Sequence, residues 1–475
     1  MVIYNPWRYA VILTYMLQNT EYHTGSYLAW FWRTQDFSRV MYRRRLDNTK
    51  AAKLLKRSLI AGMVLQTIAG VALIAYGSWQ NMSAFNLFGL ALILSLPIVW
   101  AHLITVPLAL GRWLIVNPRE QKLVEHSRRI FAEHKGVKIA VAGSYGKTTM
   151  KELLKTVLGE AKNVAATPGN KNVAVSHAYF ASRLTGQEDI LIIEYGEGQP
   201  GDVASFARNT SPTHGVITGL APAHLDHYKT IEAAGQDIFS LADYLDNKQV
   251  YVNSEPAATL PFIKRSFHRY DRTGALGWKV KNVKLLPEST SFELIKDSRT
   301  LKLTSGLLGA HQIGPLSLVA TLALDLGLSE KQVKSGIAKT VAFEHRMQPY
   351  RLNGGWVIDD TYNGNIEGIR AGTELLKALP ANRKLYITPG LVGQGDGADD
   401  IHQEMGDLIA KAQPNTVVLM QNSTTESICR GLKSGGFKGK LIIEKDPLNF
   451  YTNLSQFVAT GDVVLMQNDW TDNYA

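Results

Sequence analysis

Residues 139–154 read IAVAGSYGKTTMKELL. A β-branched run leads into a glycine-rich turn, and the turn opens a helical pattern, which is the context in which parallel α/β sheets bind phosphate. The usual spacing of such a loop is G-x-x-x-x-G-K-[ST], but the position that its first glycine would take before Gly146 is Val141. The stretch therefore predicts a nucleotide-binding α/β fold whose phosphate-binding loop is shortened.

The residue types of GSYGKTT suit a bound triphosphate. Backbone N–H groups of the loop and of the helix start would point at the phosphates, where the helix dipole favours an anion. The Lys147 ammonium would reach the β- and γ-phosphates, and the Thr148 hydroxyl would bind Mg²⁺. A plain glycine turn before a surface helix is the alternative. The loop residues expected to bind the nucleotide are Gly143, Ser144, Tyr145, Gly146, Lys147, Thr148 and Thr149.

Beyond this loop the chain alternates short apolar runs with helical stretches. VKIAVAG, ILIIEYG and HGVITGL precede a connecting stretch at 343–355, and WVIDD, KLYITPG, TVVLMQ, KLIIEK and DVVLMQ follow it. Alternation of this kind is typical of βαβ units in a parallel sheet. We therefore expect a central P-loop ATPase domain with a parallel-type sheet at about 136–342 and a C-terminal Rossmann-like α/β domain at about 343–475.

The first 135 residues have a different composition. Leu59–Trp79 contains no charged residue over 21 positions, and Phe85–Gly111 contains none over 27. About 20 apolar residues span the ~30 Å hydrocarbon core of a bilayer, whereas two buried core helices would be the soluble alternative. We expect a membrane-associated region at 1–135 with an α-helical transmembrane hairpin, whose helices lie at about 59–79 and 86–108.

Basic residues flank both apolar segments. The segment 33–57 holds nine basic residues and two acids, and so supplies +7 of the net charge of +10. More Arg and Lys residues follow between 112 and 129, while the loop 80–84 has none. The positive-inside rule then places both ends, and the catalytic domains, in the cytoplasm. We expect residues 1–50 to lie along the membrane interface, the basic segment to contact anionic lipids, and neither a signal peptide nor a nucleic-acid partner.

The remaining composition is that of a globular protein. Apolar residues make up 45% of the 475 residues and charged residues 19%. The single cysteine, Cys429, excludes a disulfide framework and a cysteine-based zinc site within one chain.

Further segments follow the glycine loop in an order that resembles the Mur ligase superfamily. These ATP-dependent enzymes form amide bonds in cell-wall synthesis, folylpolyglutamate synthetase is related to them, and their loop reads G-x-x-G-K-[ST]-[ST]. The last matching segment is closest to the ligases that add D-alanyl-D-alanine to a muramyl tripeptide, and the resemblance covers about residues 136–475. The matching segments are TPGNKN (167–172), EYGEGQPGDV (194–203), APAHLDHY (221–228), HRMQ (345–348) and DDTYNGNIEGIRAGTELL (359–376).

The resemblance implies a site for ATP and Mg²⁺. Glu194 and His224 would join Thr148 at the metal, and Lys147, His224 and Arg346 would be catalytic. Taken singly, a strand-end glutamate or a loop histidine is more often only solvated, and an interdomain salt bridge is the plain alternative for Arg346. The resemblance adds Gln312, Arg346, Asp360, Tyr362 and Asn363 to the ATP site, and gives Asn170, Asn172 and Asn365 as substrate-binding residues.

Three features depart from the superfamily pattern. No lysine lies from Thr230 to Leu241, where many relatives carry a carbamylated lysine at a second Mg²⁺, so that Gln236 or Asp237 replaces it or the second metal is absent. HQIGP at 311–315 stands where relatives have H-N-x-x-N, whose first asparagine recognises adenine. The membrane hairpin stands in place of the relatives' N-terminal UDP-binding domain.

Together these features predict a membrane-anchored ATP-dependent carboxylate–amine ligase of peptidoglycan precursor synthesis. It would activate a carboxylate as an acyl phosphate, which the amine of an amino acid or dipeptide then attacks. The precursor peptide can be UDP-linked or lipid-linked, and the oligomeric state stays open. Two alternatives remain: a poly-γ-glutamate or capsule-type ligase with the same chemistry, and a nucleotide-binding scaffold without turnover.

Overall fold

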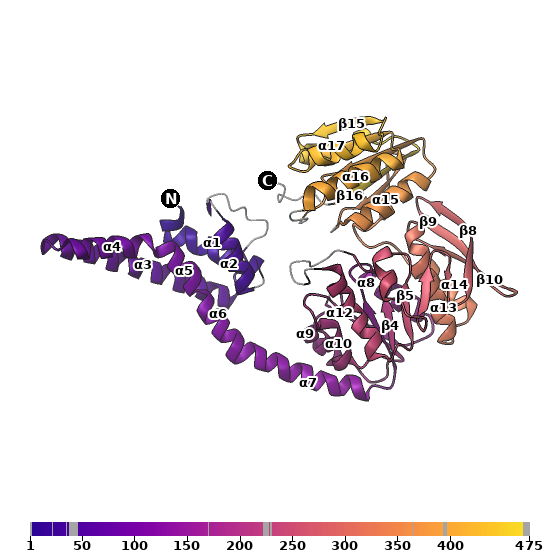
Figure 1. Cartoon of the computed structure of the whole chain (residues 1–475), viewed down its shortest axis with the longest axis horizontal. Helices are drawn as coiled ribbons and strands as arrows, with labels where there is room; N and C mark the ends of the chain where they lie inside the picture. The colour runs from indigo at the N-terminus through magenta and orange to yellow at the C-terminus, as the bar shows by residue number, and fades with distance from the viewer. Residues whose placement is uncertain are drawn as a thin grey trace. The chain divides into compact units, whose positions relative to one another are not determined.

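The computed structural model describes residues 2–20, 22–34, 36–37, 46–169, 171–221, 228, 230–362, 364–392 and 397–468. The chain consists of two compact units, Met1–Lys122 and Leu123–Ala475. Figure 1 shows the order of their elements, from the indigo N-terminal helices to the yellow C-terminal strands.

Helices are the only regular secondary structure in the described residues of the first unit. Its elements are η1 (Val2–Tyr4), α1 (Pro6–Asn19), α2 (Thr24–Arg33), α3 (Lys50–Trp79), α4 (Ser83–Leu94), α5 (Leu96–Leu103), α6 (Thr105–Gly111), the π-helical turn η3 (Arg112–Val116) and the beginning of α7 (Asn117–Glu133). Two helical stretches, Lys50–Trp79 and Leu96–Glu133, are long and apolar enough to cross a membrane by length and composition.

The second expected span, 86–108, does not form one uninterrupted helix. It runs through α4, α5 and α6, which are separated at Ser95 and Ile104. Pro97 and Pro107 explain both interruptions, because proline lacks the N–H that an α-helix needs and its ring clashes with the carbonyl four residues earlier. The hairpin expected from hydropathy is therefore a straight α3 beside a segmented return.

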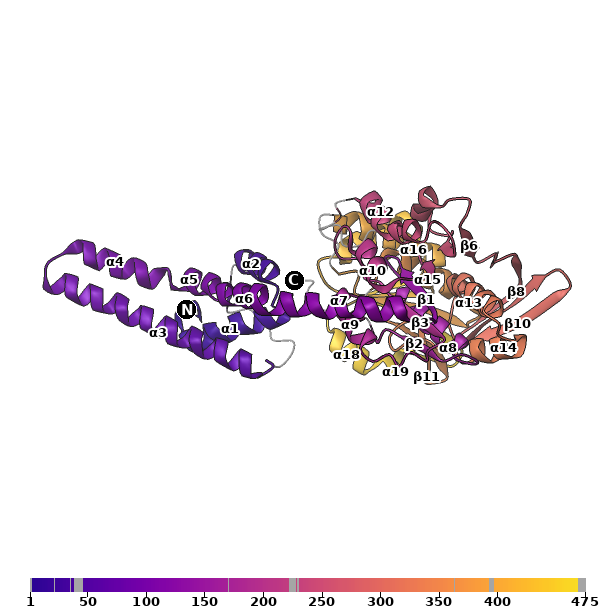
Figure 2. The same cartoon turned by 90° about the horizontal axis from the view of Figure 1, so that it is seen from below.

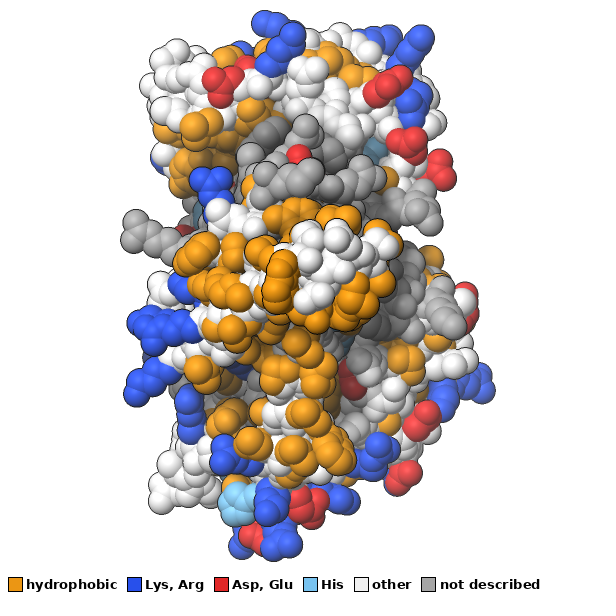
Figure 3. Space-filling model, turned by 90° about the vertical axis from the view of Figure 1, so that its left-hand side faces the viewer, with side chains coloured by type: hydrophobic (Ala, Val, Ile, Leu, Met, Phe, Trp, Pro, Cys, Tyr) orange, Lys and Arg blue, Asp and Glu red, His pale blue; other side chains and the backbone are white. Residues whose placement is uncertain are grey.

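Helices α3 and α4 pack closely side by side (Figure 2). A Cβ atom on Gly89 would lie 2.6 Å from the Gly70 carbonyl oxygen, so only a hydrogen at these positions permits the backbone contact. Helix α5 also contacts α3, since the Trp100 indole N–H donates to Gln66 Oε1 at 2.7 Å. The opposite faces stay exposed: Figure 3 shows hydrophobic side chains gathered over this unit, and Leu65 and Phe88 are 66% and 62% exposed.

Helix α1 lies inside the first unit rather than free at its surface. Tyr9, Ala10, Leu13 and Leu17 on this helix are fully buried, and they share a core with Leu59 and other residues of α3 and α5. This differs from the expectation that residues 1–50 lie along an interface, because the apolar face of α1 is already covered by protein. Part of the basic segment, 38–45, lies outside the described residues.

The second unit contains a ten-stranded sheet of order β10-β9-β8-β7-β6-β5-β4-β1-β3-β2. The neighbouring strands among β1 to β6 pair in parallel. From β6 to β10 the sheet continues with antiparallel pairs. The strands are β1 (Val137–Ala142), β2 (Val164–Ala166), β3 (Ile190–Glu194), β4 (His214–Ile217), β5 (Val250–Asn253), β6 (His268–Asp271), β7 (Gly274–Ala275), β8 (Trp278–Leu286), β9 (Ser289–Lys296) and β10 (Arg299–Ser305).

Helices cover both faces of the parallel part of this sheet. Ile139 and Val141 of β1 point into one core and Ala140 and Ala142 into the other, so the central strand is buried on both sides, as parallel sheets require. The helices and turns are α8 (Lys147–Leu158), α9 (Ala174–Ala181), α10 (Asp202–Thr210), α12 (Ile231–Tyr244), η4 (Ala257–Phe262), η5 (Ala310–Gln312), α13 (Ile313–Asp325) and α14 (Glu330–Ala338).

The C-terminal part of this unit has a six-stranded sheet of order β11-β12-β16-β13-β14-β15. Only β11 is antiparallel to its neighbour. The elements are β11 (Gln348–Leu352), β12 (Gly355–Asp360), α15 (Ile366–Ala378), β13 (Arg383–Thr388), α16 (Ala398–Ala412), β14 (Thr416–Met420), α17 (Thr425–Ser434), β15 (Lys440–Glu444), α18 (Pro447–Thr452), α19 (Leu454–Phe457) and β16 (Asp462–Gln467). The α/β fold predicted from the sequence is confirmed, with mixed rather than purely parallel sheets.

Candidate functional site

The glycine loop joins the end of β1 to the start of α8. Gly143 has φ 141° and Gly146 has φ 73°, values that side chains rarely allow. A Cβ atom on Gly143 would lie 2.3 Å from Thr218 Oγ1 at the end of β4, and Ser144 N donates to the Gly219 carbonyl at 2.9 Å. The loop is therefore pressed against the neighbouring strand end, and its two glycines are required by shape.

Lys147, the first residue of α8, is held in a buried ion pair. Its Nζ donates to Glu197 Oε2 at 2.6 Å and to the Gly143 carbonyl at 2.6 Å. The Glu197 side chain is only 4% exposed. Removing one partner of a buried ion pair leaves an unpaired buried charge, which is strongly destabilising. Lys147 can therefore bind a phosphate only if Glu197 gains another partner.

Glu194 is the last residue of β3 and makes polar contacts with three segments. Its Oε1 accepts from the Thr148 hydroxyl at 3.1 Å and from the Asn172 amide at 3.4 Å, and its Oε2 lies 3.1 Å from Lys151 Nζ. The backbone is fixed as well, since Glu194 N donates to Thr167 Oγ1. The carboxylate is 1% exposed and is positioned before any ligand binds.

The residues around Glu194 suit a Mg²⁺ ion. Carboxylate and hydroxyl oxygens are the ligands that this hard cation prefers, and Glu194 and Thr148 supply both within hydrogen-bonding distance of each other. Glu194 Oε2 is buried, and its polar contact among the described residues is the ion pair with Lys151. No group of three His, Cys, Asp or Glu residues that could hold a metal occurs in the described part of the chain. His224, the third expected ligand, lies outside it.

Two residues of this cluster are missing from the sequence prediction. Lys151 lies one helical turn after Lys147 on α8, and its side chain is fully buried against Glu194. Glu197 lies three residues after Glu194, in the loop that follows β3. A lysine at the i+4 position of Lys147 was the only available sign in the sequence, because such spacing puts both ammonium groups on one face of the helix.

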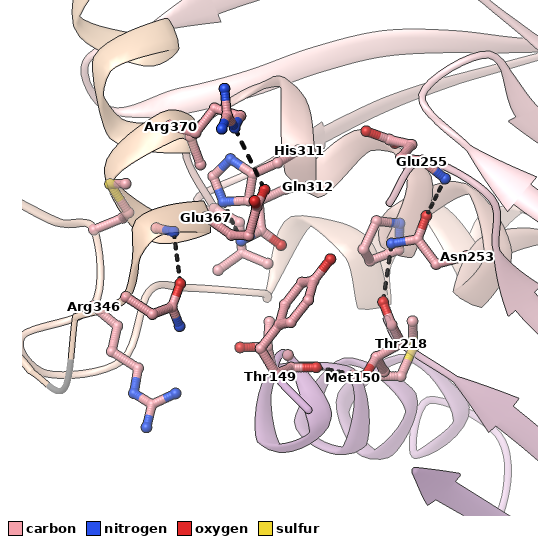
Figure 4. Close-up of a pocket in the computed structure, with 18 of the residues that line it drawn as sticks. Thr149, Met150, Thr218, Asn253, Glu255, His311, Gln312, Arg346, Glu367 and Arg370 are labelled. Carbon is pink, nitrogen blue, oxygen red and sulfur yellow. Dashed lines mark hydrogen bonds and ion pairs between the residues drawn. The ribbon is translucent and has the colours of Figure 1, made fainter. Parts of the chain in front are cut away.

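A cavity of about 360 Å³ opens beside the loop, between the two sheets of the second unit. Figure 4 shows residues from both α/β parts of this unit around it, with Thr149 and Thr218 on one side and Arg346 and Glu367 on the other. Of the predicted ATP-binding residues, those that line the cavity are Tyr145, Gly146, Thr149, Gln312, Arg346, Asp360 and Tyr362.

Asp360 ends β12 and is buried at the C-terminal wall of the cavity. It accepts from Met347 N at 3.1 Å and from the Gln467 amide at 2.7 Å. Burial nevertheless raises the pKa of its carboxyl to about 6, because loss of water disfavours the charged form more than these donors and the Arg346 charge favour it. The Arg346 guanidinium stacks over the Tyr362 ring at 4.8 Å, and Figure 4 shows it directed away from His311.

The wall near η5 holds the residues that replace the relatives' asparagines. The Gln312 amide contacts His311 Nε2 at 2.9 Å, and burial lowers the pKa of His311 to about 4, so the imidazole is neutral at pH 7. Beside them Arg272 bridges Glu255 at 2.9 Å and Glu374 of α15 at 2.6 Å. This ion pair links the two walls of the cavity.

The remaining predicted residues are placed as follows. Asn172 contacts Glu194, whereas Asn365 caps α15 by accepting from Gly368 N at 2.8 Å. Asn170 and Asn363 lie outside the described residues. Asp237, considered as a replacement for the missing lysine, accepts instead from the Tyr228 hydroxyl at 2.7 Å and from Gly201 N at 2.9 Å.

Asn468, directly after β16, is a further residue that the sequence prediction lacks. It is 2% exposed and has a left-handed backbone, with φ 69°. Neither polar atom of its amide has a hydrogen-bond partner among the described residues. A Cβ atom on Gly364 would overlap this amide, so the Asn468 side chain lies directly against the segment after β12.

Comparison with known proteins gives the class of this arrangement. Residues 141–323 match the Mur ligase middle domain. Two solved structures share the fold: MurF from Acinetobacter baumannii (TM-score 0.64, 19% identity, 74% of this chain and 77% of that chain) and MurF from Thermotoga maritima in complex with ADP (TM-score 0.64, 22% identity, 74% and 80%). Residues 141–323 thus resemble a Mur ligase middle domain, and the chain shares the fold of these MurF structures.

Curated relatives that share one enzyme name also match in sequence. The UDP-N-acetylmuramoyl-tripeptide–D-alanyl-D-alanine ligase of Mycobacterium bovis is 28% identical over 295 residues, which are 59% of this chain and 58% of that protein. The Escherichia coli enzyme of the same name is 25% identical over 278 residues, 57% and 61% of the two chains. The chain spans less than two thirds of the length of these curated relatives. The resemblance inferred from the sequence motifs is confirmed.

Proposed function

We propose that this chain is an ATP-dependent carboxylate–amine ligase of peptidoglycan precursor synthesis, similar to the MurF enzymes. One observation carries the proposal: the glycine loop, Lys147, Thr148 and the buried Glu194 form one cluster beside a cavity whose opposite wall holds Arg346 and Asp360. The relatives' names describe addition of D-alanyl-D-alanine to a UDP-linked muramoyl tripeptide, and one solved neighbour holds ADP. We infer the same classes of substrate here.

The proposed reaction has two steps. An oxygen of the precursor carboxylate attacks the γ-phosphorus of ATP, the bond to ADP breaks, and an acyl phosphate forms. The nitrogen of the amine then attacks the acyl carbon, inorganic phosphate leaves, and the nitrogen loses a proton as the amide forms. Charge spreads over the phosphoryl oxygens in the first step, and the Lys147 ammonium is the group of this chain placed to stabilise it.

Glu194 and Thr148 would hold the Mg²⁺ ion that neutralises phosphate charge when it is bound. Glu197 has a separate role in this account, since it occupies Lys147 before ATP arrives. The nucleotide must displace the buried Glu197 carboxylate from Lys147, so the free energy of this ion pair opposes binding of the phosphates. Closure of the cavity walls would keep water away from the acyl phosphate.

We further propose that α3 and the segmented return from α4 anchor the enzyme in a bilayer. Their exposed apolar faces and the basic residues around 33–57 support this, and the positive-inside rule places the second unit in the cytoplasm. A reporter enzyme fused after Ala475 should be active only in the cytoplasm. A periplasmic signal would overturn this orientation, and recovery of the full chain in the soluble fraction would overturn the anchor.

The enzymatic proposal is tested by ADP release from ATP and Mg²⁺. The full chain is assayed with UDP-muramoyl tripeptide, with its lipid-linked form and with glutamate, each with and without D-alanyl-D-alanine. We expect ADP only when a carboxylate and an amine are both present, and a loss of about 10³-fold in Lys147→Ala because a main phosphate-binding charge is removed. Lys155→Ala, an exposed lysine on the same helix, is the control. ATP binding without ADP release under every condition would favour the scaffold, and release with glutamate alone the capsule-type ligase.

A further inference from the structure

Strand β15 is the outer strand of the six-stranded C-terminal sheet. It pairs in parallel with β14, with Lys440 opposite Thr416 and Glu444 opposite Met420. Figure 1 shows β15, in yellow, at the margin of this domain. In the described part of the chain no strand pairs with its other side.

The backbone hydrogen bonds show which groups of β15 point outward. Lys440 N donates to the Asn415 carbonyl at 2.9 Å, and the Glu444 carbonyl accepts from Gln421 N at 2.8 Å, so both residues direct their backbone groups toward β14. Direction alternates along a strand, and Leu441 and Ile443 therefore present their N–H and C=O groups to the open side.

The open strand also carries exposed apolar side chains. Leu441 and Ile443 lie on the same face and are 40% and 46% exposed. Leu448, a few residues later on α18, is 79% exposed. An edge with free backbone groups and apolar side chains favours pairing with another strand.

The charged residues around β15 are complementary to the same segment read in the opposite direction. The segment 438–446 reads KGKLIIEKD: Lys438 and Lys440 precede the apolar centre, and Glu444, Lys445 and Asp446 follow it. Lys438, Lys440, Glu444 and Asp446 form no ion pair within the described residues. The two acids accept only backbone N–H groups, Glu444 from Asp446 and Asp446 from Asn449.

We propose that β15 pairs antiparallel with β15 of a second copy, about a two-fold axis at Ile442. Leu441 then lies opposite the partner's Ile443, and the two residues exchange the outward backbone hydrogen bonds. Lys440 lies opposite the partner's Glu444, and Lys438 opposite the partner's Asp446. The two six-stranded sheets become one continuous sheet across the dimer.

Other registers fit worse. Outward-pointing residues must face one another, so the register can change only in steps of two residues. A step in either direction sets Ile442 opposite a charged residue, Lys440 or Glu444 of the partner. Lysines on an edge often keep strands apart, but here each faces an acid, and opposite charges at cross-strand positions are stabilising.

A second copy of this chain is the partner that this charge order selects. An antiparallel pair of identical strands brings each segment against its own reverse, which sets both Lys438 and Lys440 opposite acids and Lys445 opposite the uncharged Gly439. The two-fold contact uses the same surface on both chains, so it closes into a dimer and leaves no open edge at this site.

The first test is sedimentation velocity of the full chain in density-matched detergent over a concentration series. We expect a monomer–dimer equilibrium whose dissociation constant rises about tenfold in Lys440→Glu, because two attractive pairs become repulsive. The double variant Lys440→Glu/Glu444→Lys restores complementarity and should return to the wild-type value. Lys433→Glu, an exposed lysine on α17, is the control and should change nothing.

The second test is a cross-link that reports the register. Non-hydrogen-bonded antiparallel pairs have Cα atoms about 4.5 Å apart, within reach of a disulfide. In a Cys429→Ser background, Ile442→Cys should give a disulfide-linked dimer under mild oxidation, and Lys433→Cys should not. The proposal is overturned if the chain is monomeric throughout, if dimerisation is unaffected by Lys440→Glu, or if both cysteine variants cross-link equally.

Discussion

The α8–β3 side of the site and the C-terminal wall of the cavity differ in how their charged groups are paired. On the α8–β3 side, beside the cavity but not among its lining residues, Lys147 pairs with Glu197 and Lys151 with Glu194, and all four side chains are largely buried. On the C-terminal wall, Asp360 is held by neutral donors, and Arg346 stacks on Tyr362. The charged groups on the α8–β3 side are paired before a ligand binds, whereas Arg346, the main cation of the C-terminal wall, stays available for a ligand.

The largest expected effect comes from breaking the Lys151–Glu194 ion pair on the α8–β3 side. Lys151→Met leaves Glu194 buried without its cation and should lower the free energy of unfolding by about 3–5 kcal/mol. Urea denaturation of the full chain in detergent measures this. Adding Glu194→Gln removes the unpaired charge and should restore part of the loss. Lys155→Met, more than half exposed on the same helix, should cost less than about 0.5 kcal/mol. An equal loss of unfolding free energy in Lys151→Met and Lys155→Met would contradict the proposed difference between the α8–β3 side and the C-terminal wall.

An intermediate effect is expected at Asp360, and it depends on pH. The pKa of Asp360 is raised to about 6 in the folded protein, so protonated Asp360 contributes stability below about pH 4 that is lost as the pH rises through 6. Asp360→Asn cannot ionise. Relative to wild type it should therefore gain about 2 kcal/mol of local stability between pH 4 and pH 7.

Hydrogen exchange of the β12 amides at the two pH values, corrected for intrinsic rates, reads out this local stability. Asp243→Asn, an exposed residue of α12, is the control and should show no such gain. If Asp360→Asn follows wild type at both pH values, Asp360 does not have the raised pKa that its burial indicates.

The smallest expected effect is at Arg346. Arg346→Gln should raise the KM for ATP about tenfold and leave unfolding unchanged, because the guanidinium makes no buried ion pair in the described residues that the fold would lose. Arg351 is the matched control, since it also stacks on an aromatic ring, Trp356, at 3.9 Å. Steady-state ADP release at varied ATP compares the two variants. A similar KM increase in Arg351→Gln would remove the assignment of Arg346 to nucleotide binding.

Local patterns explain how much of this molecule could be predicted. The strand–turn–helix around GSYGKTT depends on neighbouring residues only, and it forms as expected, with Gly143 and Gly146 in left-handed conformations. Apolar runs bounded by turn residues likewise indicated β1, β3 and β4 of the first sheet and β12 to β16 of the second. The interruption of the second apolar helix had its sign in the sequence too, at Pro97 and Pro107.

The rest depends on contacts between distant residues. Lys151 is an ordinary helix lysine by sequence, and only the approach of β3 to α8 makes it the partner of Glu194. Glu197 pairs with Lys147, Asn468 lies against Gly364 and Asp237 accepts from Gly201 N, and each of these partners is distant in the chain. The antiparallel extension β7 to β10 was not predicted because its strands alternate charged and apolar residues, as in WKVKNVKLL, and carry no signal of their order in the sheet. The roles of His224, Asn170 and Asn363 stay predictions.

The central claim is phosphoryl transfer to a carboxylate at the glycine loop, and an isotope measurement tests it most directly. The full chain is incubated with ATP, Mg²⁺, D-alanyl-D-alanine and UDP-muramoyl tripeptide whose reacting carboxylate carries oxygen-18. The account predicts that each inorganic phosphate released contains one labelled oxygen, and that Lys147→Ala releases none. Unlabelled phosphate formed together with ADP would show that ATP is hydrolysed by water, and would contradict the account.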